Sequence, residues 1–144
     1  MKCELKENFL DYKMVARIFI LSIFLIIPSA YASEEMLEIT YVETNTDIKD
    51  LLWEKRPVLV FSNSHLDPNL KQQIKMFGSD PDALSSRDVK VFVDDKLEPN
   101  SNLRKRFRPK GFLIILIGKD GQIKLRKNSP WSARELTRII DKGS

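Results

Sequence analysis

Apolar residues come in four short runs, and each run predicts a β-strand. Residues 58–63 begin with four successive apolar residues, which is typical of a strand that is covered on both faces, and residues 89–94 predict a second strand. Residues 112–118 carry no charge, which indicates a central place in a sheet. Residues 122–127 alternate apolar and polar side chains, so this run predicts a strand near an edge with one wet face.

Capping residues and helical spacing predict helices between these strands. Asp67-Pro68 and Asp80-Pro81 each place an N-cap residue before a proline at the first helical position, and a helix over 68–77 follows the first of them. The other expected helices run over 47–54 after a Thr46 cap, for one to two turns after Asn100 or Ser101, and through the C-terminal residues after Ser129-Pro130.

The order of these elements predicts the fold. A strand, helices and a second strand form a parallel βαβ unit, and a third strand turns through Lys119-Asp120-Gly121 directly into the fourth. A closing helix follows. This order predicts an α/β, thioredoxin-like fold with a central mixed sheet of four strands and helices on both faces.

The N-terminus has the pattern of a secretory signal. Lys13 and Arg17 precede an apolar run over 18–27, and Ala30 and Ala32 supply the small residues of a cleavage site. We expect cleavage after Ala32, which removes residues 1–32 and leaves no transmembrane segment, since the run is shorter than the roughly 20 residues that cross a membrane. Met14 is an alternative start.

Composition limits what the remaining chain can be. Residues 33–144 suffice for one domain with its own core, and we expect a single domain. The chain has one cysteine, Cys3, which lies in the expected signal. An exported domain without cysteine excludes thiol redox chemistry and disulfides, and it predicts periplasmic or secreted localisation.

Charge is distributed unevenly along the chain. Residues 33–100 carry 8 Lys/Arg against 14 Asp/Glu, a net charge of −6, whereas residues 101–144 carry 12 against 3, a net charge of +9. Such a split indicates contact with a polyanion. We expect no nucleic acid partner, because an exported protein rarely meets one and the basic run lacks the interleaved aromatic residues that stack bases.

Several phrases together resemble a known family. They include Leu52-Trp53-Glu54-Lys55-Arg56-Pro57, Asp67-Pro68-Asn69-Leu70, Leu103-Arg104-Lys105-Arg106-Phe107 and Leu116-Ile117-Gly118-Lys119-Asp120-Gly121. In order and spacing they resemble the exported bacterial thioredoxin-like domain of unknown function that is related to repeats of the vertebrate extracellular DUDES proteins, such as equarin and the sushi-repeat proteins. The resemblance implies secretion, a thioredoxin-like fold, no settled activity, and, for some vertebrate relatives, binding to heparan-type glycans and matrix proteins.

The loop over 62–68 occupies the position that holds the reactive cysteines in thioredoxin-like enzymes. A helix N-terminus there favours a small anion. Ser64 and His65 suggest a nucleophile and base, but no orienting acid is evident, and one histidine without cysteine is a poor metal set. The cleft candidates are Asn63, Ser64, His65, Arg87 and Pro109, the last at the place of the family's cis-proline with its isomer left open.

A basic run supplies the candidate anion patch. Guanidinium groups bind sulfate and phosphate oxygens in pairs, although a basic helix is as often only a solvated face. We expect Arg104, Lys105, Arg106 and Arg108 to point largely to solvent around buried Leu103. The full candidate set is Arg104, Lys105, Arg106, Arg108, Lys110, Lys124 and Arg126, with Lys127 as a possible extension.

The two tryptophans and two arginines outside that run favour structural roles. Trp53 and Trp131 fall where helices pack on the sheet, so we expect both in the core. Arg56 and Arg87 are expected to pair with Asp88, Asp94 or Asp95.

The leading functional hypothesis is a non-catalytic exported binding or accessory module that contacts an anionic glycan or other envelope component. It predicts no cofactor and no metal, and leaves the oligomeric state open. Two alternatives remain: a non-thiol enzyme that uses the 62–68 loop, and a structural envelope protein.

Overall fold

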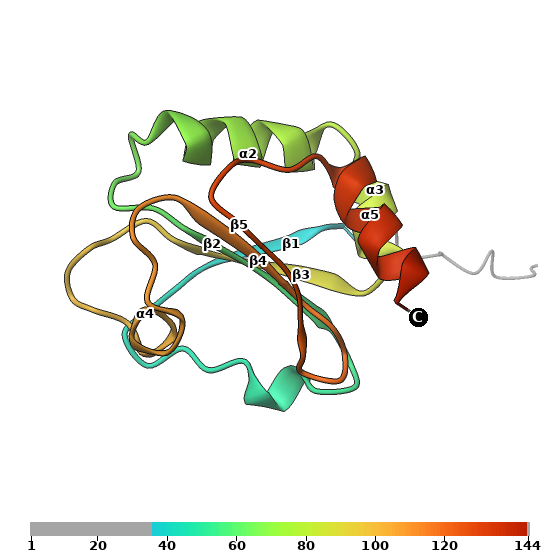
Figure 1. Cartoon of the computed structure of the whole chain (residues 1–144), viewed down its shortest axis with the longest axis horizontal. Helices are drawn as coiled ribbons and strands as arrows, with labels where there is room; N and C mark the ends of the chain where they lie inside the picture. Colours follow the sequence, from blue (N-terminus) through green and yellow to red (C-terminus); the bar gives the residue numbers. More distant parts are fainter. Residues whose placement is uncertain (1–35, 144) are drawn as a thin grey trace, which may run out of the picture. The chain divides into compact units, whose positions relative to one another are not determined.

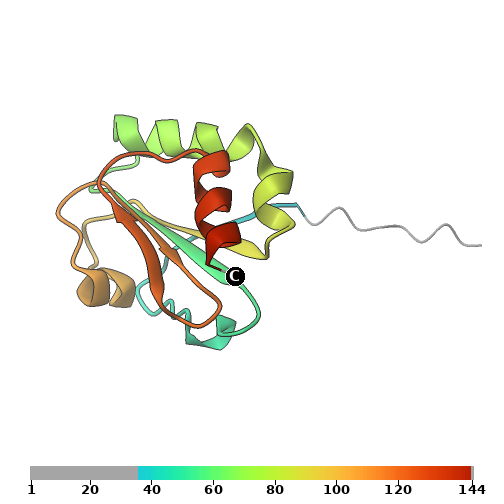
Figure 2. The same ribbon diagram turned by 45° about the vertical axis from the view of Figure 1, so that its right-hand side comes forward.

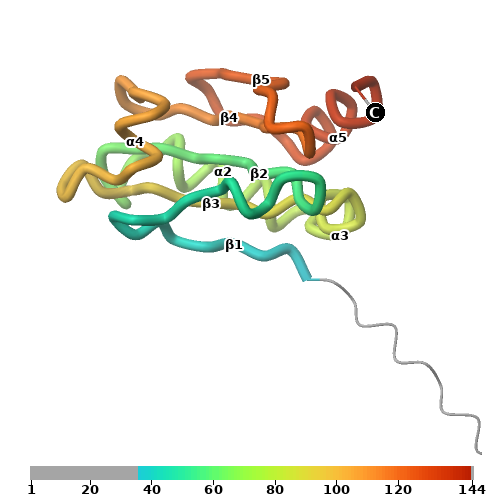
Figure 3. The backbone as a smooth tube through the Cα atoms, turned by 90° about the horizontal axis from the view of Figure 1, so that it is seen from below, coloured from blue at the N-terminus to red at the C-terminus, as the bar shows by residue number. Residues whose placement is uncertain are grey.

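A five-stranded mixed sheet forms the centre of residues 36–143, the part of the chain that the computed structural model describes (Figure 1). The strands lie in the order β1-β3-β2-β4-β5, which Figure 3 shows from below. β1 and β2 run parallel to β3, β4 is antiparallel to β2, and β5 is antiparallel to β4. The strands are β1 Glu38–Tyr41, β2 Arg56–Phe61, β3 Val89–Asp94, β4 Leu113–Ile117 and β5 Ile123–Lys127.

Helices cover both faces of this sheet, as the sequence predicts. Figures 1 and 2 show α2, α3 and α5 on one face, and α4 with the short 3-10 helix η2 on the other. Each face has its own buried apolar cluster. The helices are η2 Lys49–Leu51, α2 Pro68–Gly78, α3 Pro81–Ser85, α4 Asn102–Phe107 and α5 Ala133–Lys142. None of the helices in this part of the chain is long and apolar enough to cross a membrane.

The expected number of four strands is corrected to five. β1 is an edge strand that pairs with β3 alone, and most of its side chains are exposed. An edge strand of four residues with exposed Ile39 and Tyr41 leaves no clear buried pattern in the sequence. The four predicted strands are present: β3 has the predicted bounds, and the bounds of β2, β4 and β5 are shifted by one or two residues. Ile123, one of the apolar residues of the alternating run, is 50% exposed, whereas Leu125 is buried.

The caps of α2, α3 and α4 are those that the sequence predicts. The Asp67 and Asp80 carboxylates accept hydrogen bonds from the backbone N–H groups of Asn69 and Ala83, and each precedes a proline at the first helical position. The hydroxyl of Ser101 caps α4 in the same way.

The helix expected over 47–54 is reduced to the single 3-10 turn of η2. The Asp47 carboxylate, and not Thr46, accepts the first N–H groups of this turn, from Ile48 at 2.7 Å and Lys49 at 3.1 Å. The Thr46 hydroxyl instead accepts the N–H of Glu43. The chain cannot continue as a helix because Trp53 has a φ of 68°, in the left-handed region.

The last helix begins later than Ser129-Pro130 predicts. The buried Gln73 side chain donates to the carbonyl of Trp131 at 2.7 Å and accepts its N–H at 2.8 Å, and this pairing holds the segment before the helix outside helical geometry. α5 therefore starts after Ser132, which forms a capping box with Glu135. Residues 1–32, the expected signal, lie outside the described residues.

Candidate functional site

In the loop between β2 and α2, the polar side chains form hydrogen bonds with the backbone of the loop itself. Ser62 is fully buried, and its hydroxyl donates to the carbonyl of Ser64 at 2.7 Å. The Ser64 hydroxyl accepts the N–H of Leu66 at 3.1 Å. Asp67 already places a carboxylate at the N-terminus of α2, where a small anion was expected. The loop is thus a turn held by its own hydrogen bonds, and it ends in the negatively charged side chain of Asp67.

His65 is exposed on this loop, and among the described residues no hydrogen bond joins it to Ser64. Asp67 is engaged as the helix cap, so it does not orient the imidazole. A nucleophile–base–acid chain needs these contacts in sequence. The loop as folded does not assemble one, and it contains no cysteine.

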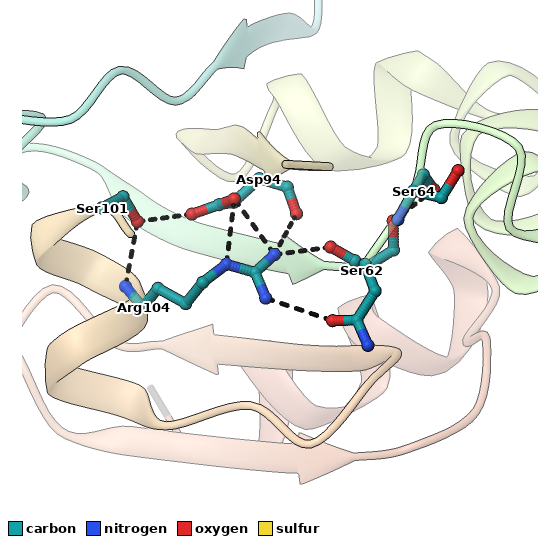
Figure 4. A network of polar contacts seen from close by, with 6 residues as sticks. Ser62, Ser64, Asp94, Ser101 and Arg104 are labelled. Atoms are coloured by element: carbon teal, nitrogen blue, oxygen red, sulfur yellow. Dashed lines mark hydrogen bonds and ion pairs between the residues drawn. The ribbon is translucent and has the colours of Figure 1, made fainter. Parts of the chain in front are cut away.

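Arg104 is buried, which corrects its expected place on an exposed basic face. It is 5% exposed, and Nη2 and Nε lie 3.1 and 3.3 Å from Asp94 Oδ1 (Figure 4). The same guanidinium donates to the carbonyls of Ser62 and Asp94 and to Oδ1 of Asn63. Ser101 donates to the second oxygen of Asp94. Every polar group of the pair therefore has a partner.

The position of Arg104 on α4 explains why it turns inward. Leu103 and Phe107 are buried one residue before it and three after it, so the three side chains share the face of the helix that meets the sheet. A buried guanidinium is tolerated because its five N–H donors meet a carboxylate and two carbonyls. The network ties α4 to the C-terminal ends of β2 and β3, and it fixes the start of the 62–67 loop.

The remaining basic residues form an exposed surface, here called the α4–β5 surface: Lys105, Arg106, Arg108 and Lys110, together with Arg126 of β5. Among the described residues none of these five forms an ion pair with a carboxylate. Arg126 donates to the carbonyl of Phe107, which joins β5 to α4, and the Arg106 guanidinium lies 5.0 Å from the Phe107 ring. Lys124, also expected in this set, pairs with Asp120 at 2.7 Å.

Arg87 lies far from the cleft in which it was expected. β2 and β3 are parallel, with Arg56 opposite Val89 and Phe61 opposite Asp94. Arg87 therefore precedes the start of β3, at the end of the sheet opposite to the 62–67 loop. Its guanidinium forms two hydrogen bonds with Asp141 of α5, at 2.8 and 2.9 Å.

Pro109 follows α4 and lines a surface hollow with Glu98, Lys105 and Arg108. Among the described peptide bonds, the cis bond is Glu98–Pro99, so the bond before Pro109 is trans. Arg108, directly before it, has a left-handed backbone with a φ of 48° and ends α4. Pro109 thus lies beside the basic surface, and the bond before it is not the cis bond that the family usually carries.

The expectation for Trp53 is wrong: this residue is 74% exposed and not in the core, whereas Trp131 is partly buried and packs against it. Asp88 forms ion pairs with Lys119 at 2.6 Å and with Lys55, and the charge of nearby Arg56 also lowers its pKa. Arg56 in addition donates to the carbonyl of Arg87 at 2.8 Å. No sequence signal distinguishes these pairings, because each depends on which turns meet at the end of the sheet.

Ion pairing holds the pKa of several carboxyl groups low. The hydrogen bond from Lys119 lowers the pKa of Asp88, and the hydrogen bonds from Arg87 lower the pKa of Asp141. Both pairs join separate elements at the end of the sheet opposite to the 62–67 loop. Within residues 36–143, no group of three or more His, Cys, Asp or Glu side chains is placed to hold a metal ion.

The fold is thioredoxin-like, as three solved structures show. Similar structures include the reduced 2-Cys peroxiredoxin of Plasmodium vivax (13% identity over 67% of this chain and 82% of that chain, TM-score 0.56) and chloroplastic thioredoxin z (16% over 74% and 94%, TM-score 0.56). The thioredoxin of Malassezia sympodialis is similar too (13% over 74% and 92%, TM-score 0.54). At these identities the likeness concerns the fold alone.

The chain belongs to the family described as Domain of unknown function (DUF4174), whose model matches residues 47–144. The match covers every strand except β1 and includes the α4–β5 surface and the 62–67 loop. No curated protein matches the sequence.

Proposed function

We propose that this DUF4174 domain is a binding module that contacts an anionic partner, a glycan or another component of the cell envelope, through the α4–β5 surface. The observation that carries the proposal is the grouping of five exposed cations on one surface, where none meets a carboxylate among the described residues and where Arg126 joins β5 to α4. Within residues 36–143, exposed cations without a carboxylate partner also occur elsewhere, on α2 and α5, so the position of the group and not the lack of pairing alone is what the test must examine.

Unpaired exposed cations of one sign raise the local potential and attract anions. Arg106 and Arg108 present guanidinium groups, which bind sulfate and carboxylate oxygens two at a time. The surface is also anchored, because the buried pair of Arg104 and Asp94 fixes α4 and Arg126 reaches its last carbonyl. Its cations are therefore held near one another without the entropy cost of ordering a loose segment.

The proposal includes export to the periplasm or the extracellular space, in keeping with the signal-like pattern of residues 1–32. It also includes a relation to the vertebrate DUDES proteins, some of which associate with heparan-type glycans. Both points are inferences from the sequence. The thioredoxin-like redox function is not part of the proposal, since residues 36–143 contain no cysteine.

The test is retention of the purified protein on a dextran sulfate column in a salt gradient, beside an ordinary cation exchanger. A variant with K105E, R106E and R108E is compared with a matched control that carries K71E, K75E and R134E. All six residues are exposed, and the control changes lie on α2 and α5, which cover the other face of the sheet. The two variants have the same net charge.

The proposal predicts that the wild type and the control elute later from dextran sulfate than from the exchanger, and that the α4 variant loses this difference while it stays folded. Equal elution of the two variants would mean that only net charge matters, and the proposal would be wrong. In that case S64A and H65A variants would test the competing enzyme hypothesis.

A further inference from the structure

Trp53 is the most unusual exposed residue in the described chain. Its side chain is 74% exposed, and its backbone φ is 68°. The left-handed region costs a non-glycine residue about 1–2 kcal/mol, and a bulky residue is rarely found there. The Trp53 N–H donates to the carbonyl of Lys119 at 2.8 Å, which fixes this conformation. An exposed ring held at such a cost indicates a role outside the fold.

A hollow of about 180 Å³ lies beside the Trp53 side chain. Ile139 and Ile140 of α5 form an apolar part of its wall, and the turn between β4 and β5 forms another side. At about 180 Å³ the hollow suits one small ring and is smaller than the roughly 300–1,000 Å³ of sites for drug-sized molecules.

The polar groups of this hollow are mostly positive. Arg56, Lys119 and Lys124 line it, against the single carboxylate of Asp120. Lys119 and Lys124 each hold one carboxylate, Asp88 and Asp120 respectively. An ammonium group has three N–H donors, so each lysine keeps donors for a ligand although it is paired. The carboxylates of Asp88 and Asp120 likewise keep free acceptor positions.

We propose that the Trp53 hollow binds a single acidic sugar unit, a ring that carries a carboxylate or a sulfate. A sugar ring presents C–H groups on a face, which suit the negative face of the Trp53 indole, and hydroxyl and acidic groups at its rim, which suit the lysines. A plain aliphatic chain would use only the apolar wall of the hollow.

This inference rests on the proposed function, because both assign an acidic glycan to the domain. The hollow takes its apolar wall from α5, on the face of the sheet opposite to α4, and the edge strand β5 links the two places: Lys124 lines the hollow, and Arg126, two residues further along, contacts α4. A glycan chain that occupies both places therefore passes around the edge of the sheet at β5. The α4–β5 surface recognises its charge, and the Trp53 hollow recognises the sugar ring.

The experiment measures dissociation constants for three probes: polygalacturonate with sugar carboxylates, dextran sulfate with sugar sulfates, and polyphosphate, which has charge but no sugar. The variants are W53A, the conservative W53F, and the matched control Y41A. Tyr41 is also an exposed aromatic residue, at 59%, but it lies on β1 at the opposite edge of the sheet.

We expect W53A to bind at least one of the two glycans about 5- to 100-fold more weakly, the range that a stacked ring contributes, while it binds polyphosphate as the wild type does. W53F should recover most of the loss, and Y41A should show none. The glycan that responds identifies the acidic group.

Unchanged binding of both glycans by W53A would overturn the inference and leave the proposed function standing. An equal loss of affinity for polyphosphate would also overturn the inference, because the sugar ring of the ligand would then not matter. Failure of the proposed function looks different: K105E, R106E and R108E together would leave all three probes bound as before.

A second readout follows the ring itself. A W131F variant leaves Trp53 as the one tryptophan of the chain. We expect its fluorescence to change on saturation with the responding glycan and to stay constant with polyphosphate. A constant signal with every probe would contradict stacking on Trp53, even if the affinities changed.

Discussion

Single residues decide where the basic half of the chain is structure and where it is surface. Arg104 stands in a run of cations, yet it is buried and paired with Asp94, while its neighbours Lys105 and Arg106 are exposed. The difference is one of helix face, since α4 packs the side of Leu103 and Phe107 on the sheet. A positive charge in the sequence is therefore no measure of charge on the surface.

Removing one partner of this pair leaves the other charge buried. We predict that R104M lowers the free energy of unfolding by about 3–5 kcal/mol, whereas R108M, an exposed change next to the same helix, stays within about 0.5 kcal/mol. Urea unfolding of both variants measures this.

A D94N/R104M double variant should lose less stability than R104M, because the uncompensated carboxylate is then absent. An R104M variant as stable as R108M would show that Asp94 is reached by water, and the buried network would not anchor α4.

Residue by residue, the sequence predicts caps well and side-chain partners badly. Asp67, Asp80 and Ser101 act within a few residues of themselves, so local pattern suffices. The partners of Arg87 and Arg104 are 54 and 10 residues away. They depend on where whole elements meet, and the choice between Asp88, Asp94 and Asp141 leaves no local signal.

Elements are joined at the end of the sheet opposite to the 62–67 loop by ion pairs that depend on pH. Arg87, which follows α3, holds Asp141 of α5 with two hydrogen bonds, and this lowers the pKa of Asp141. A carboxyl group whose folded pKa is below its unfolded value, about 4 for aspartate, adds stability above that value. The contribution is lost as the pH falls through the folded pKa.

We predict that D141N lowers the melting temperature near neutral pH and that the difference from the wild type shrinks below about pH 4. Thermal unfolding at pH 7 and pH 3 tests this. The pair is partly exposed, so added salt should also reduce the difference. In an R87Q background the pH-dependent effect of D141N should be much smaller, because only the weaker attraction of Arg56 remains. An undiminished effect there would show that Arg87 is not the main partner.

The strongly patterned elements are also the predictable ones. β2, β3 and β4 are buried on both faces and stand out as apolar runs, and α2 carries both a cap and a buried stripe. β1 is not predicted because an exposed edge strand of four residues has no such pattern. The start of α5 is predicted wrongly because Gln73, 58 residues away from Trp131, holds the segment before the helix.

Across the described molecule as a whole, paired charges and unpaired positive charges lie in different places. Its acidic N-terminal part contributes most of the carboxylates that pair with cations, and the excess positive charge gathers on α4, the segment after it and β5. The sequence predicts this excess of positive charge. Only the fold shows that Arg104 is buried in an ion pair with Asp94 and that Trp53 and Lys124 line the same hollow. The candidate site is therefore a surface at an edge of the sheet and not the loop that carries chemistry in thioredoxins.

The most direct measurement is the salt dependence of the dissociation constant for dextran sulfate. Each cation that contacts a polyanion releases bound counterions, which contributes roughly 0.7–0.9 to the slope of log affinity against log salt concentration. K105Q, R106Q and R108Q together should make this slope shallower by about 2–3, while K71Q, K75Q and R134Q leave it as in the wild type. Equal slopes in all three proteins would contradict the account, because the α4–β5 surface would then carry none of the binding.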